Sequence, residues 1–398
     1  MRKLLYALAS VAVAACATNK AGTGCSSEET ITTDSTQQFA TQLAATVNTL
    51  ANKENFCISP ASAQWALSMT ACGARGNTAK QMYEALGYPD ATVERTAFNC
   101  LQQENIERLN NSEETAISIA NSIWANKEIP LKKEFIEENA NFYDAMVKNT
   151  TFDSNAVKEI NQWCSDKTNE KINSIVEDAD PSTQLLLINT LHFKAKWMHP
   201  FYATATYEGT FTKADGEKTS VQMMYQSRIA PFYQDTIMAA TARAFEGGEY
   251  SMILILPHKW SNIERAIDRF AEIYNGKFPG NKTCTVQLSM PKFKCEFGTS
   301  LKKALQQMGV TDAFCDKADF GDISKKPLLI DDVIQKSYIA VDESGAEAAA
   351  ATAVMMIGMT ARPMEKQTLT LDRPFIYAIT SNTTGDILFI GKVGNPEF

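Results

Sequence analysis

Residues 341–360 read VDESGAEAAAATAVMMIGMT and form the most informative segment of the chain. Alanine is the best helix former, so a helix is one interpretation. Alanines would fill every face of that helix, however, and the uncharged run after Glu347 is shorter than the ~20 residues that a membrane-spanning helix needs. As a strand, the stretch has small side chains on both faces, with Glu347 on one of them. Because small side chains can pass between packed neighbours, we expect a strand that can enter an existing sheet.

The residues that follow Met359 are polar. Arg362, Pro363, Glu365 and Lys366 come shortly after it. Exposed polar loops are preferred sites of proteolytic cleavage. We therefore expect the stretch to end in an exposed loop that is a natural protease target.

The N-terminus has the pattern of a targeting segment. Arg2 and Lys3 supply a positive region, and residues 4–15 are an apolar run too short to span a bilayer. Val13-Ala14-Ala15-Cys16 resembles the bacterial lipobox, in which the cysteine becomes the acylated first residue. An ordinary secretory signal, cleaved after an Ala-x-Ala-like site, is the alternative, and Cys25 is a poorer candidate for acylation.

This reading divides the chain into three parts. We expect a lipoprotein signal peptide over residues 1–15 and a flexible, lipidated tether rich in Thr, Ser and Gly over residues 16–33, beginning at Cys16. One folded domain is expected over residues 34–398, because no composition shift divides it. The protein would then be exported and anchored by lipid to the bacterial outer membrane, on its periplasmic or surface face, with an extracellular location as the alternative.

Composition argues against several classes of function. The formal net charge is -8, and no basic stripe suited to nucleic acid is present. With three histidines and no Cys-x-x-Cys or His-Glu-x-x-His spacing, we expect no metal and no cofactor. No Gly-x-Ser-x-Gly elbow marks a hydrolase, so we expect no enzyme. The irregular cysteine spacing predicts buried free thiols rather than a disulfide framework, at Cys57, Cys72, Cys100, Cys164 and Cys315.

Hydrophobic periodicity predicts mainly helices in the first half of the domain and mainly strands in the second. Helices are expected over residues 36–50, after the Ser59-Pro60 turn up to Gly73, and over 78–86, 93–109, 131–147, 155–171 and 298–308. Strands are expected over residues 56–58, 115–124, 184–193, 250–256, 284–297, 328–341, 375–381 and 387–393. Residues 382–385 suit a hairpin between the last two. The fold class is α+β with large sheets.

Several motifs together resemble those of the serpin family of serine protease inhibitors. Residues 343–352, ESGAEAAAAT, are similar to the hinge of inhibitory serpins, and Asp372-Arg373-Pro374-Phe375 is similar to the motif after their reactive loop. The similarity extends over the whole domain in the family's order, at residues 55, 59–62, 73–78, 189–197, 222–224, 290–293 and 389–393. Each motif is weak alone, but the set is specific.

The resemblance implies a serpin fold of three β-sheets and about nine helices, with an exposed reactive-centre loop. It implies a suicide-substrate inhibitor: a protease attacks the loop through its own serine, and the cleaved loop then inserts into the main sheet while the acyl-enzyme stays trapped. Serpin loop insertion is a known example of strand addition and stored strain. The implied partners are serine proteases, with cysteine proteases as a second class, and the implied state is a monomer. A non-inhibitory serpin that binds or stores a ligand is the alternative.

The family's spacing also implies the reactive bond. The seventeenth residue counted from Glu343 is Met359, so the bond lies between Met359 and Thr360. Methionine suits proteases with a roomy apolar pocket, such as those resembling chymotrypsin, elastase or subtilisin. Met355, Met356 and Ile357 are alternatives. Arg362 would favour a trypsin-like target, but Pro363 follows it and disfavours cleavage.

The remaining site residues are implied by the same resemblance. A polar cluster would lie beneath the sheet where its strands part, made of Asn55, Ser59, Ser62, Asn189 and Gln335, the last at a position where many serpins have histidine. Ser59 could equally be a helix cap. Trp197 and an ion pair between Lys292 and Glu343 would lie at the top of the sheet, and as a surface pair the latter would contribute little. The loop hinge comprises Glu343, Gly345, Ala346, Glu347, Ala348, Ala349, Ala350, Ala351 and Thr352.

Overall fold

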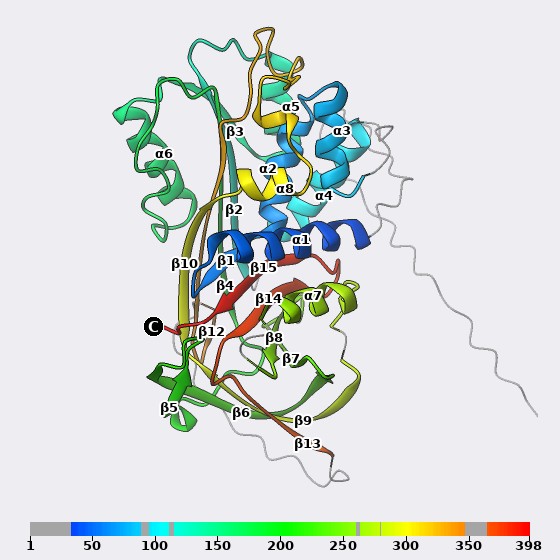
Figure 1. The fold of residues 1–398 in the computed structure, drawn as a ribbon, viewed down its shortest axis with the longest axis vertical. Helices are drawn as coiled ribbons and strands as arrows, with labels where there is room; N and C mark the ends of the chain where they lie inside the picture. Colours follow the sequence, from blue (N-terminus) through cyan, green and yellow to red (C-terminus); the bar gives the residue numbers. More distant parts are fainter. Residues whose placement is uncertain (1–32, 89–94, 111–114, 260–262, 279, 347–363) are drawn as a thin grey trace, which may run out of the picture.

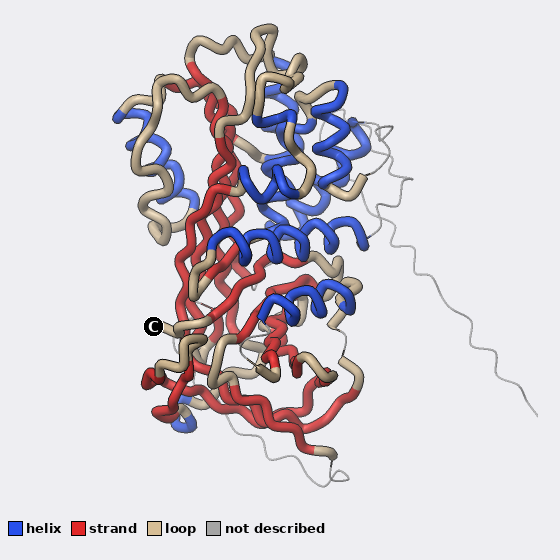
Figure 2. The backbone as a smooth tube through the Cα atoms, viewed as in Figure 1, coloured by secondary structure: helices blue, strands red, loops and turns tan. Residues whose placement is uncertain are grey.

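The computed structural model describes residues 33–88, 95–110, 115–259, 263–278, 280–346 and 364–398. Within them eight α-helices and two hydrogen-bonded sheets confirm the α+β class (Figures 1 and 2). The helices are α1 (Thr33–Ala51), α2 (Pro60–Ala71), α3 (Gly76–Ala85), α4 (Arg95–Asn110), α5 (Lys133–Tyr143), α6 (Ser154–Lys167), α7 (Ile263–Ile273) and α8 (Lys302–Gln307).

The smaller sheet carries the predicted site. It has six strands, in the order β10 (Phe293–Ser300), β11 (Asp332–Val341), β12 (Gly345–Ala346), β4 (Leu185–Lys196), β2 (Thr115–Asn126) and β3 (Met146–Thr150). Both of its faces are covered, which explains the nearly continuous apolar run of β4. Leu186 and Ile188 pack with Trp124 and Ile160 on the α6 side, whereas Leu187 and Leu191 join the main core on the other side.

The larger sheet has nine strands that form two groups. The first group is β1 (Phe56–Ile58), β15 (Ile387–Val393), β14 (Phe375–Ser381), β8 (Tyr250–Pro257) and β7 (Met238–Ala244). The second is β6 (Lys218–Gln234), β9 (Lys282–Pro291) and β13 (Lys366–Thr370), with β5 (Tyr207–Thr212) paired to β6. Among the described residues, the two groups meet only where Phe232 to Gln234 pair with β7, so this part of the chain has three strand groups.

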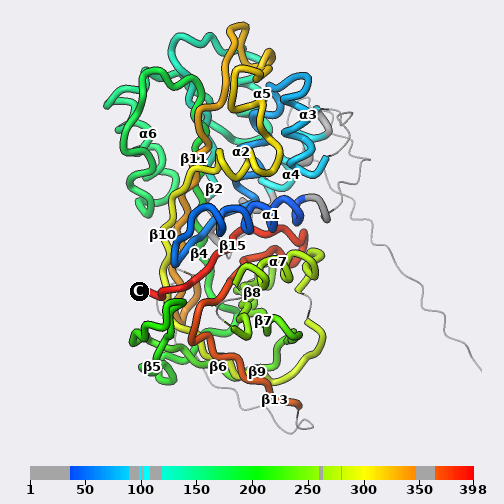
Figure 3. Tube along the Cα trace, viewed as in Figure 1, coloured from blue at the N-terminus to red at the C-terminus, as the bar shows by residue number. Residues whose placement is uncertain are grey.

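The C-terminal segment lies near the six-stranded sheet. Figure 3 shows the C-terminus beside β10, where Lys294 and Glu397 form an isolated bridge.

Helix α1 buries Phe39, Leu43 and Val47 at the predicted spacing, while Leu50 is exposed. Among the described residues, no helix combines the length and the apolar character needed to cross a bilayer.

Three local predictions were wrong. The helix expected over residues 131–147 ends at Tyr143, because Asp144 adopts a left-handed conformation and the chain continues as β3. Residues 298–300 belong to β10, so the helix expected over 298–308 is confined to α8. Cys57, Cys72 and Cys164 are buried free thiols as predicted and Cys315 is a partly exposed one, but Cys100 is disulfide-bonded.

Candidate functional site

The short strand β12 lies between β11 and β4 at one end of the six-stranded sheet. Ala346 pairs with Val341 of β11, while Gly345 and Ala346 pair with Lys196 and Ala195 of β4, all antiparallel. Farther along, β11 and β4 pair directly and in parallel, from Asp332 with Leu186 to Tyr338 with His192. The resemblance implied a reactive loop held outside the sheet, but Gly345 and Ala346 at its start already occupy the position of an additional strand.

The small size of these two residues permits that position. A Cβ atom at Gly345 would lie 2.1 Å from the carbonyl oxygen of Ala195 and 2.6 Å from the Cα atom of Lys196. Both are backbone atoms that cannot move aside easily. Ala346 is fully buried. Only glycine therefore fits at position 345 without displacing the backbone of β4, and the buried position that follows is occupied by the small Ala346.

A turn centred on Asp342 reverses the chain from β11 into β12. The Asp342 carboxylate accepts hydrogen bonds from the N–H groups of Ser344 (2.7 Å) and Gly345 (3.2 Å), and the Asp342 N–H donates to the Gly345 carbonyl (2.9 Å). Burial raises the pKa of Asp342 despite these bonds. Asp342 was missed as a site residue, although an aspartate two positions before Ser-Gly is typical of such turns.

Trp197 lies beneath this turn. Its ring stacks on Phe245 with centroids 4.6 Å apart and an interplanar angle of 8°, and it is almost completely buried. Its Nε1 donates to the Asp342 carbonyl (2.9 Å), and its backbone N–H donates to the Ser344 carbonyl (2.9 Å). Trp197 therefore connects the hydrophobic core to the turn that begins the loop.

Lys292 and Glu343 form an ion pair next to the turn, with Nζ 2.8 Å from Oε2. The Thr206 hydroxyl donates to the other carboxylate oxygen (2.7 Å). The two charged side chains are only 23% and 15% exposed, so the pair is largely buried and not the surface pair that we expected. Burial alone would raise the pKa of Glu343, but the hydrogen bonds from Lys292 and Thr206 outweigh it and the pKa is lowered. The pair fixes the residue from which the loop departs.

A buried polar network joins β4, β11 and the start of α2, and we call it the interstrand cluster. Gln335 Nε2 donates to Asn189 Oδ1 (2.6 Å) and to the Ser59 carbonyl (2.8 Å), while its Oε1 accepts from the Ser59 N–H (2.9 Å). Asn189 Nδ2 donates to the carbonyl of Ser62 (2.9 Å) and also to the side-chain oxygens of Ser62 and Asn121. Five residues make up this cluster: Ser59, Ser62, Asn121, Asn189 and Gln335.

Ser59 combines the two roles considered for it. Its hydroxyl caps α2 by accepting from the Ser62 N–H (3.2 Å), and its backbone forms the two-way contact with Gln335. Asn121 was missed; its position opposite Asn189 in the β2–β4 register explains the contact and could not be read from the sequence alone.

Asn55 does not belong to the cluster, contrary to the prediction. Its Nδ2 donates to the Asn395 carbonyl (2.7 Å), and its Oδ1 accepts from the N–H groups of Gly394 (2.8 Å) and Asn395 (2.9 Å). Asn55 therefore holds the C-terminal segment after β15. The physical reason is that Asn55 precedes β1, which pairs with β15 and places the end of the chain beside it.

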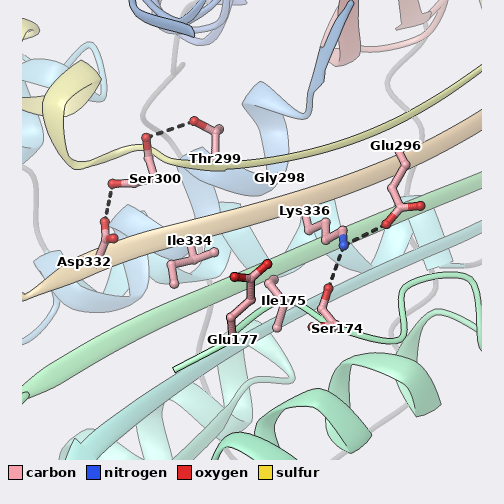
Figure 4. Close-up of a pocket in the computed structure, with 10 residues that line it drawn as sticks. All are labelled: Ser174, Ile175, Glu177, Glu296, Gly298, Thr299, Ser300, Asp332, Ile334 and Lys336. Carbon is pink, nitrogen blue, oxygen red and sulfur yellow. Dashed lines mark hydrogen bonds and ion pairs between the residues drawn. The ribbon is translucent and has the colours of Figure 1, made fainter. Parts of the chain in front are cut away.

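A surface groove of about 510 Å³ lies on the α6 side of the same sheet (Figure 4). Lys336 of β11 crosses one end of it, because its Nζ binds the Ser174 carbonyl (2.7 Å) and the Glu296 carboxylate (2.7 Å). Lys336 therefore links the segment that follows α6 to β11. It was not predicted, because Ser174 and Glu296 reach it only through the tertiary fold.

The rest of the predicted site lies outside the described residues. This applies to Cys16, to the reactive bond between Met359 and Thr360, and to the hinge residues Glu347, Ala348, Ala349, Ala350, Ala351 and Thr352. Among the residues that are described, no group of three or more His, Cys, Asp and Glu side chains is arranged to hold a metal ion. The described part of the site therefore comprises β12 with its turn at one end of the β4–β11 pair and the interstrand cluster farther along the same two strands.

The comparisons with known proteins agree with this architecture. The family model for "Serpin (serine protease inhibitor)" matches residues 34–396. Leukocyte elastase inhibitor A of Mus musculus is 30% identical over 374 residues, covering 90% of this chain and 97% of that protein.

Two solved structures are similar over nearly the whole chain. Tengpin, a thermophilic serpin crystallised in its native state, has a TM-score of 0.84 at 32% identity and covers 94% of this chain and 97% of its own. Human thyroxine-binding globulin has a TM-score of 0.82 at 25% identity, with coverage of 92% and 98%. The chain therefore belongs to the serpin family.

Proposed function

We propose that this serpin inhibits serine proteases by offering the bond between Met359 and Thr360 as bait and inserting the cleaved loop into the six-stranded sheet. The observation that supports the proposal is β12, in which Gly345 and Ala346 are already paired with β4 and Ala346 is also paired with β11. An added strand would continue from these two residues. The small side chains from Ala348 to Thr352 suit that path.

The proposed reaction begins as ordinary acyl transfer. The protease serine attacks the Met359 carbonyl carbon, the Thr360 nitrogen leaves as an amine, and an acyl-enzyme forms. The freed loop then inserts between β4 and β11, which must part from the pair Tyr338–His192 toward Asp332–Leu186. The ladder hydrogen bonds and apolar burial that the loop gains provide the driving force, and the attached protease is distorted before it can deacylate.

The second candidate is a non-inhibitory serpin that binds a ligand. Family membership does not decide between the two, because one fold hosts several functions. Thyroxine-binding globulin, named for its ligand, has the same fold. The hinge favours inhibition. Gly345 and the run of alanines after it are small enough to enter the sheet, and a serpin that never inserts its loop does not require such small residues.

We also propose that the domain is held at the outer membrane by a lipid on Cys16, acts as a monomer, and uses no cofactor. The lipobox-like Val13-Ala14-Ala15-Cys16 supports the anchor. Partition of the full-length protein into a detergent phase, lost on Cys16→Ser exchange, would support it. Unchanged partition of the variant would contradict it.

The inhibitory function is tested by incubating the protein with chymotrypsin-, elastase- and subtilisin-like proteases. An inhibitor forms an adduct that survives boiling in detergent and releases a C-terminal fragment that begins at Thr360. Cleavage at this bond with no adduct for any protease would instead identify a mere substrate and favour the binding-protein alternative. A fragment beginning elsewhere within residues 356–360 would move the bait bond but leave the mechanism intact.

A further inference from the structure

Arg243 of β7 is a buried cation for which the described residues provide no carboxylate. It is 7% exposed. Its Nε donates to Gln226 Oε1 (3.0 Å), and its Nη1 donates to the Thr241 hydroxyl (3.0 Å) and the Ala242 carbonyl (2.9 Å). Its buried Nη2 has no hydrogen-bond partner among these residues. A buried charge is normally paired, because removing it from water costs several kcal/mol. The partner of Arg243 therefore has to be sought outside the described side chains.

A second arginine lies close enough to repel it. Arg228 of β6 donates from Nη2 to the Tyr202 hydroxyl (3.2 Å), and within the described ranges it too forms no ion pair. Burial, and then the charge of Arg228, lower the pKa of Arg243 to about 10, so the Arg243 guanidinium group remains charged at neutral pH. The same two causes lower the pKa of His199 beside them. Two like charges in a poorly solvated place attract an anion strongly.

Both arginines line one cavity of about 220 Å³, which we call the arginine cavity. It lies between the segment that follows β4 and the strands β6 and β7. Trp197 and Phe201 form an apolar wall of the cavity. Met198 and Ile229 are 44% and 63% exposed and lie where the cavity reaches the surface. The cavity is smaller than most ligand sites, which measure about 300–1,000 Å³. It therefore suits a small ligand with one anionic end and an apolar body.

We propose that the arginine cavity binds a small monocarboxylate with an apolar body, such as a short-chain fatty acid or an aromatic acid. The carboxylate accepts hydrogen bonds from Arg243 Nη2 and from the guanidinium group of Arg228. The apolar body lies against Trp197 and Phe201. An inorganic anion would satisfy the charge but leave this wall without a partner, which is why we favour an organic acid.

Calorimetric titration of the intact protein tests the site without any protease, so its outcome is independent of the proposed inhibition. Hexanoate and benzoate are the probes, and hexanol, benzyl alcohol and sulfate are the controls. We expect saturable binding of at least one acid, with its neutral alcohol and sulfate at least about tenfold weaker, since one lost charged contact is worth about 1.4 kcal/mol or more. No saturable binding of either acid, or alcohol or sulfate binding as tight as that of the acid, would overturn the proposal.

Variants locate the bound acid. Arg228→Gln is expected to weaken hexanoate or benzoate binding about tenfold or more, and Arg243→Gln more still. Should Arg243→Gln fail to fold, Ile229→Glu replaces it, because this exposed residue can add a repelling charge without disturbing the core. Arg265→Gln, at an exposed position on α7, is the matched control and leaves binding unchanged. Unchanged affinity in both Arg228→Gln and Ile229→Glu would show that the acid binds elsewhere.

Discussion

Gln335 and Asn189 lie directly opposite each other in the parallel pair of β11 and β4, and Gln335 Nε2 donates a 2.6 Å hydrogen bond to Asn189 Oδ1. Both side chains are almost completely buried. Insertion of a strand between β4 and β11 has to break this contact, because it separates the two strands. The interstrand cluster thus stabilises the closed sheet that the proposed mechanism opens.

Replacing Gln335 with leucine tests that role. The exchange leaves the Ser59 N–H and Asn189 Oδ1 without their partner, whereas the Ser59 carbonyl still accepts from the Ala63 N–H. We therefore expect a loss of about 1 to 3 kcal/mol in the free energy of unfolding, measured by urea denaturation. It should also speed the loss of inhibitory activity when the intact protein is warmed, because the strands part more easily. Gln307→Ala, on the exposed surface of α8, is the control. An unaltered urea midpoint in the Gln335 variant would rule out a stabilising role for the cluster.

A substitution at position 335 is also expected to change how the stability of the protein depends on pH. None of the five cluster side chains titrates near neutral pH, so the cluster's contribution is expected to be constant between about pH 5 and 8. Gln335→His introduces a buried imidazole whose pKa burial lowers below the ordinary value of about 6.5. The unfolded state then binds the proton more readily, and the variant loses stability as pH falls through about 6.5. If the difference in the free energy of unfolding between Gln335→His and the parent protein stayed the same from pH 8 to about pH 5, this prediction would be contradicted.

The Lys292–Glu343 pair is expected to matter because it is largely buried. Glu343→Gln should lower the free energy of unfolding by about 1 to 3 kcal/mol at neutral pH, since Lys292 and Thr206 lose a charged acceptor. The lowered pKa of Glu343 means that its contribution is complete above the ordinary glutamate pKa of about 4.3 and disappears as pH falls through the folded value.

The exposed pair Arg269–Glu272 on α7 provides the comparison for that prediction. Glu272 is 64% exposed, so Glu272→Gln should change stability by no more than about 1 kcal/mol. Equal effects of the two exchanges would mean that Glu343 behaves as an ordinary surface carboxylate.

Ala346→Arg should convert the inhibitor into a substrate. Ala346 is fully buried between β4 and β11, and a charge at this position would have to be buried without a partner. Loop insertion then slows, deacylation overtakes it, and cleavage products accumulate at the expense of the detergent-stable adduct. Ala346→Ser, small and uncharged, is expected to retain most of the adduct. Undiminished adduct from the arginine variant, measured on denaturing gels, would argue against insertion past this residue.

The sequence predicted the hinge because its small residues form one local pattern, but it did not predict β12. Gly345 and Ala346 lie inside the sheet because β4 and β11 separate beyond Tyr338. The separation of two strands that are far apart in sequence leaves no local pattern near Gly345. Asn189 and Gln335 were identified through family motifs. Asn121 was missed and Asn55 misassigned for one reason: hydrogen-bond partners depend on register and on the position of the C-terminus, and neither leaves a local signal.

The arginine cavity left no signal in the sequence either. Arg243 lies in a strand, where an arginine is ordinarily exposed to solvent, so the sequence does not mark it as buried. Only the fold places it beside Arg228 with its Nη2 buried. Asp342 is different, because its turn is local and its position before Ser-Gly could have identified it.

Loop insertion can be measured as the melting temperature of the protein before and after a single cut within residues 355–360. We predict that the nicked protein melts well above the intact one, since residues beyond Ala346 then extend β12 between β4 and β11, and that nicked Ala346→Arg gains much less. A nicked protein that melts no higher than the intact protein would show that the cut loop does not enter the sheet.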